Sequence, residues 1–215
     1  MISTPNGVLV STDEIHYKAW RQLAEEINIS FDRKIFNRFR GVSRMDCLEL
    51  LLANAHEDYS DVEKEAMANR KNHLYLKHLQ KLSEKDICEG AKKLLMELES
   101  NGVLIAVGSS SKNTNIILEK TGLLPFIDTV VDGNEITKSK PDPEVFILAA
   151  DRLGVPYESC MVIEDAESGI EAARSVGMKV IGIGDAVRDC VHMDLFSPLP
   201  FAPVEMTVIP PVLPA

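Results

Sequence analysis

Beyond residue 88, short apolar runs alternate with helical patterns, and this alternation restricts the possible folds more than any other feature. The runs expected to form strands are Val103–Val107, Thr129–Val131, Met161–Ile163 and Lys179–Ile183. Between them, helices are expected through residues 116–118, over 144–153 and over 168–176. Continuous apolar strands that alternate with helices are typical of a parallel sheet covered on both faces. The pattern therefore predicts an α/β fold.

Residues 12–85 differ, because they carry helical patterns and almost no strand signal. The helices expected there span residues 13–27, begin again at residue 43, and run from 61 to about 79. Thr12 or Asp13 is the expected N-cap of the first helix. Residues 1–11 and 86–215 are therefore predicted to form the α/β core, and residues 12–85 a small all-helical domain inserted into it.

Composition and charge exclude several kinds of partner. The 215 residues suffice for one sizeable core with a smaller accessory domain, and 45% hydrophobic with 26% charged residues is ordinary for a soluble globular protein. A formal net charge of -10 disfavours nucleic acids and anionic membranes, which are bound through basic patches. No apolar stretch approaches the roughly 20 residues that span a bilayer, and no signal peptide is recognised. We therefore expect a cytoplasmic protein.

The cysteines and the C-terminal tail carry little functional signal. The four cysteines are widely spaced, without a Cys-x-x-Cys pair, and are expected to be reduced structural thiols. The tail after residue 194 is rich in proline, so a short strand at 194–196 and a helical turn at 204–208 are the most regular structure expected there.

Three polar segments lie at or just beyond the ends of expected strands. They are the run Ser109–Asn113, the turn Ser139–Lys140–Pro141 and the acidic pair Glu164–Asp165. Ligands of parallel sheets bind outside the carboxyl ends of the strands, so these segments are expected to converge on one crevice. Ser109, Ser110 and the adjoining backbone N–H groups can donate hydrogen bonds to a phosphate, and Lys140 can supply positive charge.

Each segment also has a simpler interpretation. A serine run is often only a helix cap, and an isolated lysine is most often solvated, although the prolines of Ser139–Pro143 stiffen the turn that aims Lys140. Asp165 is equally compatible with an N-cap of the following helix. Two adjacent carboxylates at a strand end also suit Mg²⁺, which takes one or two carboxylates and completes its coordination with water and phosphate oxygens. The three segments in this order favour a phosphate site.

These motifs together resemble those of the haloacid dehalogenase superfamily. The matching segments are Gly7–Val10, Ser109–Asn113, Ser139–Pro143 and Glu164–Ile170. The helical insertion resembles that of the beta-phosphoglucomutase branch. The resemblance covers the chain from Gly7 to about Phe196 and implies a Rossmann-like parallel sheet core with an inserted all-helical cap domain. It also implies Mg²⁺ as cofactor, bound by Glu164, Asp165 and the backbone carbonyl of Asn6.

In that branch the cap domain contributes a histidine, an arginine and a lysine to the closed site. The matching positions in this sequence are His16, Arg44 and Lys71. The resemblance also makes Asn72 and Thr12 candidates for substrate contact. These cap matches favour a mutase over the phosphatases of the same superfamily.

Family members carry an Asp-x-Asp-Gly loop after the central strand, and this sequence departs from that pattern. In the family, the first Asp attacks phosphorus to form an aspartyl phosphate and binds Mg²⁺, while the second acts as general acid and base. Thr4 and Asn6 stand at these positions. A threonine hydroxyl is neutral at pH 7 and needs a neighbouring base, and an asparagine amide cannot act as a general acid or base. We therefore expect severely impaired turnover.

The segment before Thr4 is short. Only Met1–Ser3 stand where the family has a buried apolar strand, and Pro5 disfavours the interior of a strand ladder. A truncated central strand is expected to weaken the sheet. Either the chain is a catalytically disabled descendant, or its N-terminus differs from that of a working enzyme.

The expected function is that of a beta-phosphoglucomutase-like sugar-phosphate protein. The family reaction converts beta-glucose 1-phosphate into glucose 6-phosphate by phosphoryl transfer through a bisphosphate. Two alternatives stay open, namely a sugar-phosphate phosphatase of the same fold and a non-catalytic protein that binds phosphosugars. A small phosphorylated sugar is the expected partner, and a monomer is the expected state.

Overall fold

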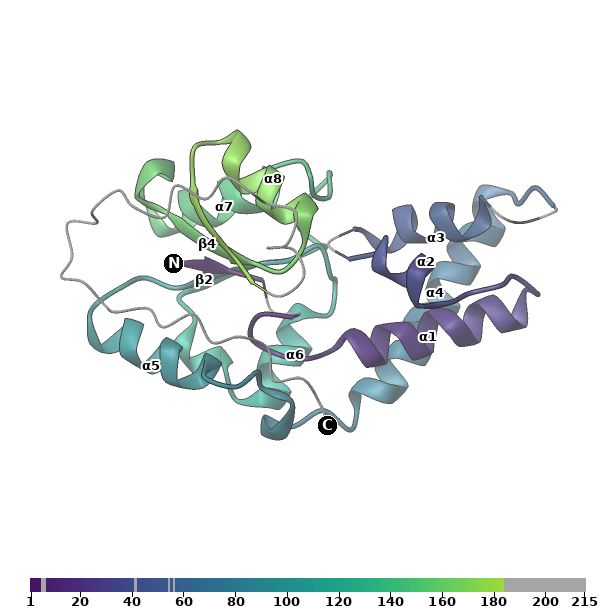
Figure 1. Ribbon diagram of the computed structural model, residues 1–215, viewed down its shortest axis with the longest axis horizontal. Coiled ribbons are helices and arrows are strands. Elements are labelled where there is room, and N and C mark those ends of the chain that lie inside the picture. Colours follow the sequence, from purple (N-terminus) through teal and green to yellow (C-terminus); the bar gives the residue numbers. More distant parts are fainter. Residues whose placement is uncertain (5–6, 41, 54, 56, 184–215) are drawn as a thin grey trace.

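The computed structural model describes residues 1–4, 7–40, 42–53, 55 and 57–183 (Figure 1). Asn6, Cys190 and the elements expected at 194–196 and 204–208 lie outside the described residues. Within the described ranges, Cys47, Cys88 and Cys160 are free thiols. No helix in this part of the chain is long and apolar enough to cross a membrane.

The predicted alternation of strands and helices is present. The strands are β1 (Ile2–Ser3), β2 (Ala106–Gly108), β3 (Thr129–Val131), β4 (Met161–Glu164) and β5 (Lys179–Gly182). The α-helices are α1 (Asp13–Glu26), α2 (Arg33–Asn37), α3 (Arg44–Leu52), α4 (Asp61–Leu79), α5 (Ala91–Ser100), α6 (Thr114–Thr121), α7 (Glu144–Leu153) and α8 (Glu167–Ser175). Short 3-10 helices form at η1 (Glu84–Asp86), η2 (Leu124–Phe126) and η3 (Tyr157–Ser159).

The five strands form one sheet in the order β3-β2-β1-β4-β5, and every pair is parallel. Although β1 has only two residues, it lies at the centre and pairs with β2 on one side and β4 on the other. The carboxyl ends of these three strands therefore lie next to one another, with Thr4 between Ser109 and Glu164. The predicted α/β fold with a Rossmann-like parallel sheet is confirmed.

Helices cover both faces of the sheet (Figure 1). On one face, Phe146 of α7 and Ala172 of α8 share a buried cluster with Ile2 of the central strand. On the other face, Leu95 of α5 and Ile117 of α6 belong to a second buried cluster. Burial of apolar surface contributes roughly 25 cal/mol per Å², so these two layers hold the central strand in place despite its length.

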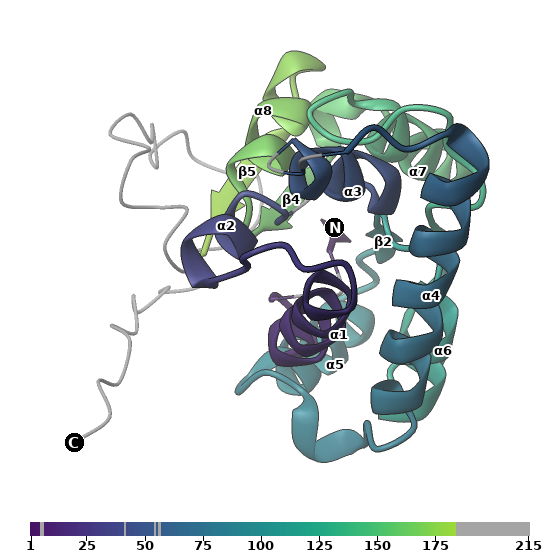
Figure 2. The ribbon, with the colours of Figure 1, turned by 90° about the vertical axis from the view of Figure 1, so that its right-hand side faces the viewer.

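The helices α1–α4, here called the cap helices, lie beside the sheet rather than on its faces (Figures 1 and 2). They enclose a separate cluster that includes Trp20, Phe36 and Leu48. α1 and α4 pack side by side, and Ala19 of α1 and Tyr75 of α4 belong to the same buried cluster as Leu95 and Ile117 of the core. The cap helices are thus a helical unit seated on the core. The exact domain boundaries stay a prediction.

The two connections between the core and the cap helices run side by side. Val10 and Ile87 form an antiparallel bridge between them. On either side of this bridge, Ser11 N donates to Asp86 O at 2.9 Å and Cys88 N donates to Leu9 O at 2.9 Å. The cap helices are therefore attached through one paired segment rather than through two independent linkers.

The strand expected over Val103–Val107 is shorter in the structure, since β2 begins at Ala106. Ile2 pairs with Ala106, so Val103 and Leu104 have no β1 residue opposite them and are 38% and 43% exposed. The Met1 ammonium donates to Leu104 O at 2.5 Å at this end of the ladder. An apolar run becomes a strand only where another strand satisfies its backbone hydrogen bonds.

Candidate active site

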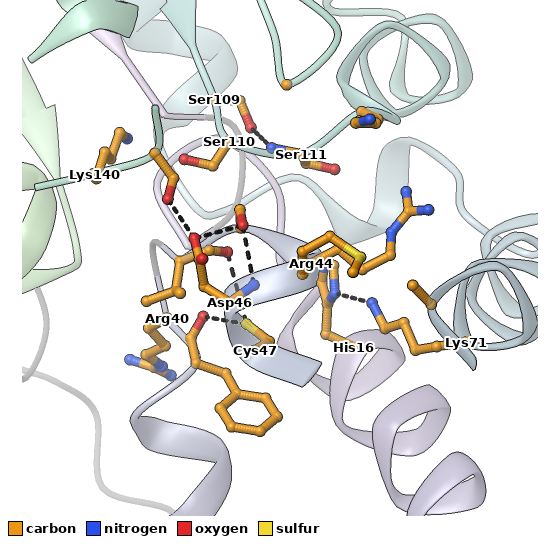
Figure 3. A pocket seen from close by; sticks show the side chains of 18 of the residues that line it. His16, Arg40, Arg44, Asp46, Cys47, Lys71, Ser109, Ser110, Ser111 and Lys140 are labelled. Carbon is orange, nitrogen blue, oxygen red and sulfur yellow. Dashed lines mark hydrogen bonds between the residues drawn. The ribbon is translucent and has the colours of Figure 1, made fainter. Parts of the chain in front are cut away.

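A pocket of about 740 Å³ lies between the cap helices and the carboxyl edge of the sheet (Figure 3). Its lining includes most of the predicted site residues: Thr4, His16, Arg44, Lys71, Ser109, Ser110, Lys140, Glu164 and Asp165. Thr12 and Asn72 are not part of the lining. Thr12 is fully buried, and the Asn72 amide oxygen accepts a hydrogen bond from Asn113 Nδ2 at 2.9 Å. The volume suits a small-molecule ligand.

Ser109 follows β2 directly and is almost fully buried at the sheet edge. Its backbone N–H donates to Val131 O at 3.0 Å, and its hydroxyl oxygen accepts from Ser111 N at 3.1 Å. α6 begins five residues later with Asn113 as N-cap, so Ser109 is not the cap of that helix. The interpretation of this serine as a helix cap is therefore wrong.

Lys140 is buried rather than solvated, with 4% of its surface exposed. Its Nζ donates to Glu164 Oε2 at 2.9 Å and to Gly108 O at 3.4 Å, and lies 4.7 Å from the centre of the Phe146 ring. The interpretation of Lys140 as a surface lysine is wrong. Its charge lies at the sheet edge beside the end of β2.

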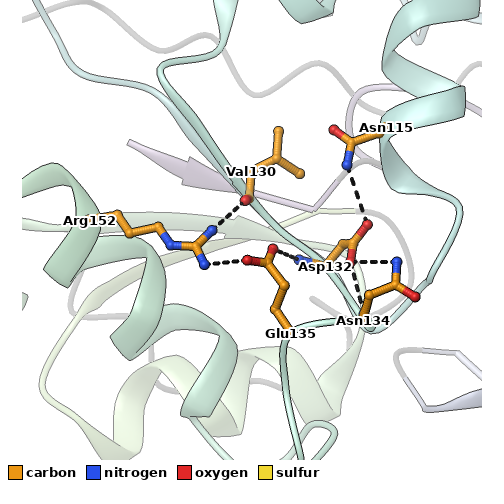
Figure 4. Close-up of polar contacts among 6 residues, drawn as sticks. All are labelled: Asn115, Val130, Asp132, Asn134, Glu135 and Arg152. Carbon is orange, nitrogen blue, oxygen red and sulfur yellow. Dashed lines mark hydrogen bonds and ion pairs between the residues drawn. The ribbon is translucent and has the colours of Figure 1, made fainter.

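The loop that leads to Lys140 begins at the end of β3, where several hydrogen bonds hold its first residues (Figure 4). The Asp132 carboxylate accepts from the backbone N–H of Asn134 at 2.8 Å, and Arg152 of α7 donates to Val130 O at 2.9 Å. Arg152 also forms an ion pair with Glu135. These contacts tie the loop to both β3 and α7.

The acidic pair ends β4 inside the pocket. Glu164 is 1% exposed, and its Oε1 accepts from Ala166 N at 3.2 Å. Burial raises the pKa of Asp165 to about 7, and the negative charges of Glu164 and Asp13 act in the same direction. The N-cap of α8 is Ala166, without a side-chain cap, so the interpretation of Asp165 as a helix cap is wrong.

The acidic pair fits a divalent cation. Burial is the main cause of the raised pKa of Asp165, the adjacent charge of Glu164 adds to it, and Lys140, which contacts Glu164, offsets part of it. The described residues contain no group of three or more His, Cys, Asp and Glu side chains that could hold a metal by themselves. Mg²⁺ needs only one or two carboxylates when water and phosphate supply the remaining oxygens.

Two glycines make room for these carboxylates. An ideal Cβ on Gly7 would lie 1.9 Å from Asp165 Oδ2, and one on Gly169 would lie 2.3 Å from Glu164 Cδ. Gly7 also has a φ of +76°, which L side chains rarely adopt. The loop after β1 and the helix α8 therefore approach the acidic pair as closely as backbone allows.

Substituting Gly169→Ala is expected to displace Glu164 and weaken its bond to Lys140. Because the carboxylate is buried, the free energy of unfolding should fall by about 1–3 kcal/mol, as in other overpacked cores. Urea unfolding measures the change, with Glu171→Ala on the exposed side of the same helix as the control. Equal stabilities of the two variants would contradict the close packing of α8 on Glu164.

Thr4 occupies the centre of the site. It is 5% exposed, and its backbone N–H donates to Ile163 O at 3.4 Å. Thr4 lines the pocket, and its buried hydroxyl has no hydrogen-bond partner among the described residues. Buried hydroxyl groups are nearly always hydrogen-bonded, so this one is suited to a ligand or water in the pocket.

The cap side of the pocket carries a cluster of three basic side chains, His16, Arg44 and Lys71 (Figure 3). Lys71 Nζ lies 3.1 Å from His16 Nδ1 and 4.9 Å and 4.8 Å from the ring centres of Trp20 and Tyr75. Burial lowers the pKa of His16 well below its usual value, and the charges of Lys71 and Arg44 lower it further. Neither Arg44 nor Lys71 forms an ion pair with a carboxylate of the described residues. An anionic ligand would balance this charge.

Replacing Lys71 by methionine is expected to stabilise the ligand-free protein near pH 7. Burial lowers the pKa of Lys71 from 10.5 to about 7, and Arg44 adds to this effect while Cys47 opposes it. Between pH 10.5 and 7 the unfolded chain binds this proton more strongly, so wild-type stability falls as pH falls through this window.

The Lys71→Met variant should lack this part of the pH dependence and should gain roughly 1–4 kcal/mol near pH 7. Urea unfolding at several pH values between 7 and 10 measures both effects. The exposed Lys77→Met on the same helix is the control. A Lys71→Met variant that is less stable than wild type at every pH would contradict the claim that the buried charge of Lys71 destabilises the ligand-free protein.

Several contacts between pocket residues had no signal in the sequence. Asp13 and Arg40 form an ion pair at the cap side, and both influence Asp165 electrostatically. Asp46 and Ser139 also line the pocket and bond to each other across it. Such long-range pairs follow from the packing of the cap helices on the core, which no local pattern encodes.

Comparison with known proteins identifies the family. The model of haloacid dehalogenase-like hydrolases matches residues 6–183, which is most of the chain. The chain belongs to the haloacid dehalogenase-like hydrolase family. Beta-phosphoglucomutase of Bacillus subtilis (strain 168) is 38% identical over 181 residues, covering 83% of this chain and 80% of that protein.

Other members of the family extend this similarity. A phosphorylated carbohydrates phosphatase of Thermotoga maritima is 27% identical, covering 86% of this chain and 84% of that protein. The crystal structure of beta-phosphoglucomutase from Clostridium difficile superimposes with a TM-score of 0.82 at 35% identity, covering 86% of this chain and 83% of the other. The predicted resemblance to the haloacid dehalogenase superfamily and to beta-phosphoglucomutase is confirmed.

Proposed function

We propose that the pocket binds a phosphorylated sugar, as a beta-phosphoglucomutase-like site does. The observation that supports this most is the arrangement of charge within one pocket of about 740 Å³. Lys140 and the turn at Ser109 lie on the core side, and Lys71 and Arg44 lie on the cap side without carboxylate partners in the described part of the chain. Such a site can hold anionic groups on both sides of a small polar ligand.

Each group of residues has a distinct part in this proposal. Ser109, Ser110 and Lys140 would hold a phosphate at the sheet edge, beside the Thr4 hydroxyl. Glu164, Asp165 and the backbone carbonyl of Asn6 would hold Mg²⁺, which when bound supplies charge stabilisation to phosphate oxygens. His16 is neutral near pH 7 because its pKa is lowered, so it would accept or donate a single hydrogen bond.

We further propose that turnover of the family reaction, beta-glucose 1-phosphate to glucose 6-phosphate, is severely impaired in this chain. Thr4 stands at the nucleophile position, and its buried hydroxyl has no carboxylate hydrogen-bonded to it among the described residues to remove its proton. Asn6 at the acid–base position has an amide that cannot exchange a proton in this role. The residues that bind phosphate would remain while the phosphoryl acceptor is missing.

A coupled assay with beta-glucose 1-phosphate, Mg²⁺ and a sugar bisphosphate primer tests the proposal. We expect glucose 6-phosphate to form at a rate near background, while calorimetry detects binding of beta-glucose 1-phosphate. A turnover number of the order of 10 s⁻¹, which is typical of enzymes, would contradict the impairment.

The same assay separates two alternatives. Release of inorganic phosphate without isomerisation would indicate a sugar-phosphate phosphatase, which the similarity to the Thermotoga maritima phosphatase keeps as second candidate. Binding without either product would indicate a non-catalytic phosphosugar-binding protein. A monomeric state and a cytoplasmic location remain part of the proposal.

A further inference from the structure

Two side-chain hydrogen bonds connect the cap helices with loops of the core. Asn113 Nδ2 donates to Asn72 Oδ1 at 2.9 Å, and Ser139 Oγ donates to Asp46 Oδ2 at 2.7 Å. The partners in each pair are far apart in the sequence, so both bonds depend on how the cap helices sit on the core. Neither Asp46 nor Ser139 has a role in the proposed chemistry.

Both bonds lie next to residues that form the proposed ligand site. Asp46 stands two residues after Arg44, and Ser139 directly precedes Lys140. On the other side, Asn72 directly follows Lys71. Each bond therefore fixes one cationic residue of the cap relative to one phosphate-binding segment of the core.

The Asp46 carboxylate is oriented for this contact before the core is considered. Ser43, the N-cap of α3, donates its hydroxyl to Asp46 Oδ2 at 2.6 Å and accepts from Asp46 N at 3.2 Å. The same oxygen then accepts from Ser139 Oγ at 2.7 Å. The first turn of α3 holds the Asp46 carboxylate in place. Arg44 lies in the same turn, so a contact that fixes the carboxylate also fixes the backbone of Arg44.

Hydrogen bonds to α7 also hold the loop that carries Ser139. The backbone N–H groups of Thr137 and Lys138 donate to Glu144 Oε2 at 2.9 Å and 2.7 Å, which ties the loop to α7. Lys140 itself is buried against Glu164. The hydrogen bond between Asp46 and Ser139 thus joins the first turn of α3 to a loop that α7 already holds. Because both partners are fixed, the bond forms in only one position of the cap helices relative to the core.

We propose that Asp46 and Ser139 form a clasp that positions Arg44 relative to Lys140 by seating the cap helices in one register. Asp46 is a positioning residue, since it acts through Arg44 and touches no reacting atom. The inference rests on the proposed function for its ligand-binding consequence, while its effect on cap seating does not depend on any ligand.

A double-mutant cycle of Ser139→Ala and Asp46→Asn tests the clasp. Each single variant is expected to weaken binding of beta-glucose 1-phosphate about twofold to tenfold, which corresponds to one hydrogen bond. The double variant should bind no more weakly than the worse single variant, because both substitutions remove the same bond. Thr137→Ala is the matched control, since the Thr137 hydroxyl lies in the same loop and donates to Glu144 of α7, not to the cap helices.

Small-angle X-ray scattering of the ligand-free variants gives a second readout. Ser139→Ala and Asp46→Asn should each increase the radius of gyration relative to Thr137→Ala, because a less firmly seated cap samples more open positions. A purely local role of Asp46 in capping α3 would leave Ser139→Ala identical to the control in both experiments and would overturn the proposal. Losses that multiply in the double variant would overturn it as well.

The two readouts separate this inference from the proposed function. If the wild-type protein binds no sugar phosphate, the proposed function fails, and the scattering comparison still decides whether the clasp seats the cap. If wild type binds and Ser139→Ala changes neither affinity nor scattering, the clasp fails and the proposed function stands.

Discussion

Introducing Thr4→Asp and Asn6→Asp together is expected to raise mutase turnover by roughly 10³-fold or more over wild type. The size follows from enzymes in which removal of a covalent nucleophile costs several orders of magnitude. Thr4 already lies at the end of the central strand, buried between the ends of β2 and β4, so an aspartate there would face Lys140 and the acidic pair. The coupled assay with Mg²⁺ and a bisphosphate primer measures the gain.

Single variants serve as controls for this experiment. Thr4→Asp alone introduces a phosphoryl acceptor without a general acid and base, and Asn6→Asp alone introduces the acid and base without an acceptor. The turnover of each single variant should therefore stay far below that of the double variant. Thr4→Asn with Asn6→Asp matches the shape of the double variant without the nucleophilic charge and should stay inactive. If the double variant is folded and remains inactive, the two-residue central strand or a remodelled pocket limits the chemistry.

Replacing Lys140 by methionine is expected to lower the free energy of unfolding by about 3–5 kcal/mol. The Lys140–Glu164 ion pair has a distance of 2.9 Å, and both side chains are 2% exposed. Removal of one partner leaves the other charge buried without compensation, which is far more costly than removal of both. Adding Glu164→Gln to Lys140→Met should therefore recover most of the loss.

The neighbouring Lys138→Met is the control for this prediction. Lys138 lies 3.5 Å from Asp142, but its side chain is 72% exposed, and exposed pairs contribute little. Urea unfolding should therefore show a small effect for Lys138 and a large effect for Lys140. Equal losses in the two variants, or a double variant less stable than Lys140→Met, would contradict a buried and coupled pair.

Helix bounds agree with the sequence where local signals mark both ends. α4 spans the expected Asp61–Leu79, because Ser60 forms a capping box with Glu63 at its start. α7 has the expected span Glu144–Leu153, where Gly154 follows in the left-handed conformation. The sequence does not predict α5, whose Gly90 cap offers no side-chain bond, nor the short α2, although the Asp32 side chain caps it. Capping chemistry therefore marks the bounds of some helices and leaves others unmarked.

The candidate site was predictable to the extent that strand ends define it. Ser109, Glu164 and Thr4 follow neighbouring strands, so the topology of a parallel sheet brings them together. His16 and Lys71 were predicted only from the resemblance to a family. The contact between Lys71 Nζ and His16 Nδ1 at 3.1 Å follows from no periodicity in the sequence. Contacts between the cap helices and the core depend on three-dimensional packing, so the sequence does not predict them.

Isothermal titration calorimetry of the wild-type chain with beta-glucose 1-phosphate and Mg²⁺ tests the central claim most directly. We expect saturable binding without conversion of the ligand, because the phosphate-binding groups remain while Thr4 and Asn6 stand at the positions of the reacting carboxylates. Ser109→Ala and Arg44→Ala should each weaken this binding from opposite sides of the pocket. No detectable binding by the folded wild-type protein, or ready conversion to glucose 6-phosphate, would contradict the account.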